Sequence, residues 1–164
     1  MGAYLVASRV AVVTVAIAVV VVAVFGLLYY QATREGEAVR GLRVEVAGVS
    51  ITRLGLSSCD IAIRFRYTNP SDYDTPTFWV SSYSIYVNGE LVGTGSMPPT
   101  KVVARSSVYQ DLTITVEYSK VSRALVDALL RGKLVVEVRG EVRAKVLFGL
   151  LEVSAPFTST YSVG

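Results

Sequence analysis

The sequence predicts an all-β fold, an antiparallel β-sandwich of immunoglobulin or fibronectin-III type with about seven strands and one short helix. Three observations predict it: apolar and polar residues alternate in several segments, hairpin signals separate these segments, and one segment has helical spacing. A long apolar run precedes them. We therefore expect a head and transmembrane helix in residues 1–31, a charged linker in residues 32–41 and the sandwich in residues 42–164.

The N-terminal apolar run extends from Val10 to Tyr30 and carries no charge. As a helix it would be about 31 Å long, close to the hydrocarbon thickness of a bilayer. Although valine and isoleucine are poor helix formers in water, the backbone in lipid must satisfy its own hydrogen bonds, which favours a helix. Tyr29 and Tyr30 suit the membrane interface. The run therefore predicts a single-pass anchor, with the lipid bilayer as its partner.

Two other interpretations of this run are a cleaved signal peptide and a buried core helix. No small-x-small cleavage pattern occurs near Gln31, because Tyr30 occupies its first position. A short head before a folded domain favours a domain outside the cytoplasm. Counting Arg9 on one side against Arg34, Arg40 and Arg43 on the other weakly favours the opposite orientation. We expect the domain to be extracytoplasmic.

The clearest strand runs from Cys59 to Thr68, where every second residue is apolar. It ends at Asn69-Pro70, a turn signal, and an aromatic-rich strand follows between Phe78 and Val87. We place these two strands in one β-layer. Asn88-Gly89 predicts a hairpin to the next strand. Further strands are expected over Leu42 to about Arg53, Glu90–Ser96, Val108–Tyr118, Lys133–Val146 and Leu151–Tyr161.

The spacing of apolar residues changes after Tyr118 and predicts a short helix. Ser119 is the expected N-cap, and Gly132 ends the segment as a C-cap glycine does. We expect this helix to cover an edge or open end of the sheets. Leu125 and Leu129 on its apolar face would then lie near a cleft between the sheets, the candidate site for a lipid or another hydrophobic ligand.

Composition excludes several kinds of chemistry. The chain has no histidine and one cysteine, so Ser-His-Asp and Cys-His relays, four-ligand zinc sites and an intramolecular disulfide are all excluded. Asp72 and Asp74, with Asp60 nearby, offer too few oxygens for Ca²⁺ and are interpreted as solvated turn residues. We expect no catalytic residue, no metal ligand and no cofactor.

The net charge of +3 is spread over outward strand positions of both signs. Arg64 and Arg66 on one strand, and Arg139, Glu141 and Arg143 on another, predict solvated, ion-paired faces. Basic runs interleaved with aromatic residues do not occur, so nucleic acid is not an expected partner. Asparagine and glutamine are scarce, which fits a thermophilic source.

From residue 42 to residue 161 the pattern resembles the group-2 late-embryogenesis-abundant domain, also called the water-stress and hypersensitive-response domain. The resemblance lies in an alternating strand ending in Asn69-Pro70, a Tyr-x-Ile-x-Val hairpin strand closed by Asn88-Gly89, and the polar pair Ser106-Ser107 before the next strand. It implies a small sandwich tied to stress tolerance, without catalytic residues. It also implies that Asn69, Pro70, Asn88 and Gly89 are structural turn residues.

Three functions remain open at this point. The first is a non-enzymatic protective or interaction module held at a membrane. The second is a lipid or hydrophobic-ligand binder. The third is a surface-filament subunit that assembles by strand addition through its N-terminal apolar segment or its last strand, although Arg9-Val10 lacks the small residue expected at a pilin-type processing site.

Overall fold

The structure is a computed structural model that describes residues 2–163, with side chains described from residue 17 onward. The chain divides into two compact units, one ending at Arg34 and the other beginning at Glu35. The first unit is helical. Among the described residues, one helical stretch, Ile17–Arg40, is long and apolar enough to cross a membrane, as a membrane anchor or a signal sequence would be.

The helix α1 covers Gly2–Arg40 and so includes nearly all of the expected linker, residues 32–41. Its last turn belongs to the second unit, where Ala38 and Val39 are fully buried. The structure buries these two small apolar residues of the charged stretch and leaves Arg40 exposed.

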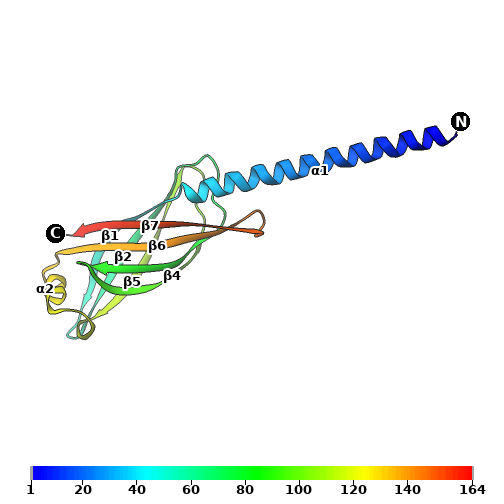
Figure 1. The fold of residues 1–164 in the computed structure, drawn as a ribbon. Coiled ribbons are helices and arrows are strands. Elements are labelled where there is room, and N and C mark those ends of the chain that lie inside the picture. The colour runs from blue at the N-terminus through cyan, green and yellow to red at the C-terminus, as the bar shows by residue number, and fades with distance from the viewer. Residues whose placement is uncertain (1, 164) are drawn as a thin grey trace. The chain divides into compact units, whose positions relative to one another are not determined.

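The second unit is a sandwich of two antiparallel sheets (Figure 1). One sheet has the order β1-β2-β5, formed by Arg43–Leu54, Ser58–Asn69 and Ser106–Glu117. The other has the order β4-β3-β6-β7, formed by Glu90–Thr100, Phe78–Val87, Leu134–Val146 and Leu151–Val163. The predicted all-β sandwich of seven strands is therefore confirmed.

The expectation that β2 and β3 share one layer is wrong, because β2 pairs with β1 and β5 while β3 pairs with β4 and β6. The reason lies in the loop after Pro70, which is too long for a hairpin and crosses from one sheet to the other. Their apolar faces meet across the core, where the Tyr67 and Phe78 rings make an edge contact with centroids 5.4 Å apart.

The two sides of the sandwich differ. At one side β1 lies beside β7, and the Val46 amide donates a 2.8 Å hydrogen bond to Ser159 Oγ. The pairing of β1 with β2 shifts register between Val46 and Gly48, so this bond between the sheets lies beside the register shift. The other side is bounded by the edge strands β4 and β5. β4 carries Pro98 and Pro99 and β7 carries Pro156, which suits strands at sheet edges.

The short helix is α2, Arg123–Arg131, and its C-cap is Gly132 with φ 69° as predicted. Its N-cap is Ser122, whose side chain accepts a 3.2 Å hydrogen bond from the Leu125 amide, and not Ser119 as expected. Tyr118–Lys120 forms a separate 3-10 turn, and Val121 is extended, so the α-helix begins only after Ser122. Figure 1 shows α2 beside the strand ends at one end of the sheets.

Candidate functional site

Asn69 lies fully buried at the end of β2, where the chain leaves the first sheet. Its Nδ2 donates to the Tyr73 carbonyl at 2.7 Å and to the Val102 and Val103 carbonyls at 3.3 Å. Its Oδ1 accepts from the Ser71 amide at 3.0 Å and the Ser71 hydroxyl at 2.7 Å. One amide side chain therefore joins the loop after β2 to the segment between β4 and β5. Pro70 follows it and is exposed.

Asn88 and Gly89 form the β3–β4 turn with φ values of 50° and 85°. Such values favour asparagine and glycine, as the hairpin signal predicted. Asn88 also reaches β6, because its Oδ1 accepts a 2.8 Å hydrogen bond from the Val135 amide and its backbone amide donates to the Val135 carbonyl at 2.8 Å. The turn that joins β3 to β4 is therefore also hydrogen-bonded to β6.

The loop carboxylates considered as Ca²⁺ ligands have other partners. Asp72 pairs with the Arg105 guanidinium, and this hydrogen bond holds the pKa of the Asp72 carboxyl below its usual range. Asp74 accepts a 2.9 Å hydrogen bond from the Ala104 amide, which lowers its pKa, and pairs with Lys101 at 3.3 Å. Among the described residues, no group of three or more acidic or cysteine side chains gathers in a way that could hold a metal ion.

The expected ion-paired faces are present on both sheets. Arg64 contacts Asp111 at 2.7 Å and Arg66 contacts Glu45 on the outer face of the first sheet. On β6, Arg139 contacts Glu137 at 2.6 Å and Arg143 contacts Glu141 at 2.7 Å. These pairs are exposed and salt-screened, so they contribute little to stability. They make the outer faces polar and of mixed charge.

Cys59 lies at the start of β2 and is 1% exposed. Burial raises the pKa of its thiol, and the neighbouring Asp60 charge adds to the effect. The buried Tyr67 hydroxyl donates to the Met97 sulfur at 3.3 Å, and burial raises its pKa as well. Both groups stay protonated at neutral pH, as core residues do.

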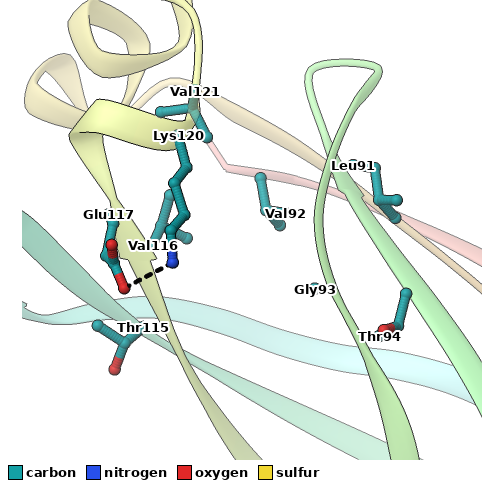
Figure 2. Close-up of a pocket in the computed structure, with 9 residues that line it drawn as sticks. All are labelled: Leu91, Val92, Gly93, Thr94, Thr115, Val116, Glu117, Lys120 and Val121. Carbon is teal, nitrogen blue, oxygen red and sulfur yellow. Dashed lines mark hydrogen bonds and ion pairs between the residues drawn. The ribbon is translucent and has the colours of Figure 1, made fainter.

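Leu125 and Leu129 are 2% and 1% exposed and pack into the core beneath α2. A hollow lies away from these two leucines, between the edge strand β4 and the end of the edge strand β5 (Figure 2). It measures about 320 Å³, and Val92 and Gly93 face Val116 and Val121 across it. The Lys120–Glu117 ion pair, 3.0 Å long, lies on its rim. A role for Leu125 and Leu129 in a ligand cleft stays a prediction.

Sequence reasoning did not single out the contact between Glu35 and the β6–β7 turn. The Glu35 carboxylate accepts a 2.8 Å hydrogen bond from the Leu147 amide, which connects the end of α1 to a turn 112 residues away. Phe148 in that turn is 79% exposed. The signal available in the sequence was the uninterrupted apolar composition of Val146–Leu151.

The two-sheet sandwich and its turns match a known protein family. The family model described as late embryogenesis abundant protein matches residues 64–160, from β2 almost to the end of β7. The chain therefore belongs to the late embryogenesis abundant family. No curated protein matches it.

Among the similar solved structures, one supports the fold. The solution structure of an Arabidopsis thaliana protein is 20% identical, with a TM-score of 0.55 and coverage of 73% of this chain and 78% of that one. A crystal structure of an Archaeoglobus fulgidus protein is 18% identical with a TM-score of 0.42, covering 73% and 93%. A solution structure described as a candidate late embryogenesis abundant protein is 12% identical with a TM-score of 0.45, covering 74% and 69%. At these identities the first comparison supports the fold alone.

Proposed function

We propose that this protein is a non-enzymatic, stress-protective or interaction module of the late embryogenesis abundant type, anchored in a membrane by its N-terminal helix with the sandwich outside the cytoplasm. The observation that carries the proposal is the family match over residues 64–160 in a chain that also holds an apolar helix long enough to span a bilayer. The polar, ion-paired outer faces and the buried thiol and phenol suit a protective surface better than a catalytic centre.

The test uses the full chain reconstituted in vesicles that enclose a self-quenching dye. After drying and rehydration, vesicles with the full chain are expected to retain more dye than vesicles holding only residues 1–34. Equal leakage from both would refute the protective role. Loss of the protein from the vesicles at alkaline pH would refute the anchor, independently of the leakage result.

A second candidate is the binding of a lipid or another hydrophobic ligand with a polar end, and the hollow between β4 and β5 favours it, because valines and the Lys120–Glu117 ion pair both border it. Its volume of about 320 Å³ falls at the lower end of the range for ligand pockets. A Cβ at Gly93 would lie 3.9 Å from Ile114 Cγ2, an ordinary contact, so a larger side chain can enter the hollow without forcing the backbone.

The Gly93→Val variant tests this candidate. A ligand that co-purifies with the full chain in native mass spectrometry should be lost from Gly93→Val. It should be kept in Gly48→Val, where the added Cβ also meets its nearest neighbour at 3.9 Å but lies on β1. A bare chain in the unchanged protein would remove this candidate.

A further inference from the structure

The turn between β6 and β7 combines three features that the fold alone does not require. The segment Val146–Leu151 contains no polar side chain. Phe148 is 79% exposed, Leu150 76% and Leu151 53%. Three neighbouring side chains of this size exposed at one tip form a compact apolar surface, of the kind that marks an interaction site.

The backbone of the turn is a second feature. Leu147 and Phe148 have φ values of 53° and 55°, followed by Gly149 at 87°. Bulky side chains disfavour this left-handed region, and asparagine or glycine is the usual choice, as at the Asn88-Gly89 turn of the same protein. Large apolar residues therefore occupy positions where local stability favours small or polar ones. Strain of this kind concentrates at functional positions.

The tip also extends beyond its neighbours. The pairing of β3 with β6 ends at Ala144, whereas the pairing of β6 with β7 continues to Val146 and Leu151. Figure 1 shows the orange-to-red β6–β7 hairpin reaching past the end of β4, the opposite edge strand of the same sheet. No other strand of the described sandwich pairs with these last positions, so the exposed side chains are free to contact another surface.

The hydrogen bond between the tip and Glu35, close to the end of the apolar run, indicates which surface the tip contacts. The Glu35 carboxylate holds the Leu147 amide at 2.8 Å. Glu35 follows Tyr30, the end of the apolar run, by five residues, which span about 8 Å in a helix. Wherever the apolar run enters a bilayer, the tip is therefore tethered within roughly 15 Å of the bilayer surface. The headgroup layer is itself about 5–8 Å thick on each side.

We propose that the β6–β7 tip, Leu147–Leu151, inserts its apolar side chains into the interface of the same lipid bilayer that holds α1. This inference rests on the proposed membrane anchoring. The exposed Lys145 beside the tip can extend its ammonium group toward lipid phosphates while the tip is inserted. A second point of contact would fix the orientation of the sandwich on the membrane surface, which a single helix cannot do.

The test uses the full chain in lipid nanodiscs, with Cys59 replaced by alanine and one environment-sensitive fluorophore attached at a new cysteine. Leu150→Cys places the label at the tip. Leu56→Cys is the matched control, because Leu56 is an exposed leucine in the β1–β2 turn at the opposite end of the strands. Val22→Cys reports the anchor itself. Spin-labelled lipids that quench at headgroup depth and at chain depth are then added.

We expect the label at position 150 to lose most of its fluorescence to the headgroup-depth quencher and the label at position 56 to lose none. Adding Phe148→Ser should lower the ratio of inserted to free tip roughly tenfold to a hundredfold, since burial of one large apolar side chain has about that effect.

The outcomes separate the two proposals. If the label at position 22 is not quenched, the proposed anchoring fails. If position 22 is quenched and position 150 is not, or if the signal at position 150 depends on the amount of protein per nanodisc, the membrane contact of the tip is refuted.

Discussion

Replacing the buried amide of Asn69 should destabilise the sandwich by more than any exposed turn substitution. In Asn69→Ala the three shortest of its hydrogen bonds, at 2.7, 3.0 and 2.7 Å, are lost together. At about 1 kcal/mol net for each, the free energy of unfolding falls by about 3 kcal/mol. The two bonds of 3.3 Å add little, because the Val102 carbonyl keeps the Thr75 amide as a donor and the Val103 carbonyl keeps the Ser106 hydroxyl.

The measurement is urea unfolding of the full chain in detergent, followed by fluorescence of Trp79. This is the one tryptophan in the chain and lies on β3, so the signal reports the sandwich and not the N-terminal helix. A loss of about 3 kcal/mol corresponds to a melting temperature lower by roughly 10 °C for a domain of this size.

The matched comparison is Asn88→Ala, which removes an exposed turn asparagine and should cost about 1 kcal/mol, because water replaces its hydrogen bonds. A loss below about 1 kcal/mol for Asn69→Ala would refute the reasoning, since it would mean that water reaches the buried amide site and supplies the missing bonds.

Three further outcomes follow from the same structure. Gly140→Ala should lower stability by about 1–3 kcal/mol in urea unfolding, because the added Cβ would lie 2.8 Å from the Ser82 carbonyl oxygen; Gly48→Ala, with its nearest contact at 3.9 Å, should be close to neutral. Cys59 should react with a thiol reagent only as fast as the chain unfolds, and rapid labelling in buffer would contradict its burial. Arg105→Gln should raise the pKa of Asp72 toward its ordinary value in an NMR titration. The stability that this pair contributes is present above the unfolded pKa of Asp72 and is lost as pH falls through its lower folded pKa, so the parent and variant should converge in acid.

Most strands were predictable because they bury one face, whereas β4 was predictable from the Asn88-Gly89 turn before it. The alternation of Ile61, Ile63, Phe65 and Tyr67 in β2 is the alternation of the buried core, and Leu134 to Val146 behaves in the same way. The two turn glycines, Gly89 and Gly132, were predictable because their left-handed conformations select glycine.

The assignment of strands to sheets was not predictable in the same way. Nothing local in β2 or β3 says which partner each chooses, because the choice depends on the long loop after Pro70 and on the buried bonds of Asn69 to residues more than 30 positions away. The same holds for Glu35 and Leu147, whose contact joins residues 112 positions apart in the sequence. The burial of Ala38 and Val39 was hidden by the charged residues around them.

The prolines of the edge strands have a consequence for how copies of the domain can pack against one another. Three of the five prolines, Pro98, Pro99 and Pro156, lie on β4 and β7, the two edges of the larger sheet. A proline lacks the amide hydrogen that a neighbouring strand would need, so a second molecule cannot continue the ladder past these positions. At high protein concentration these two edges therefore resist the strand-by-strand addition of further chains.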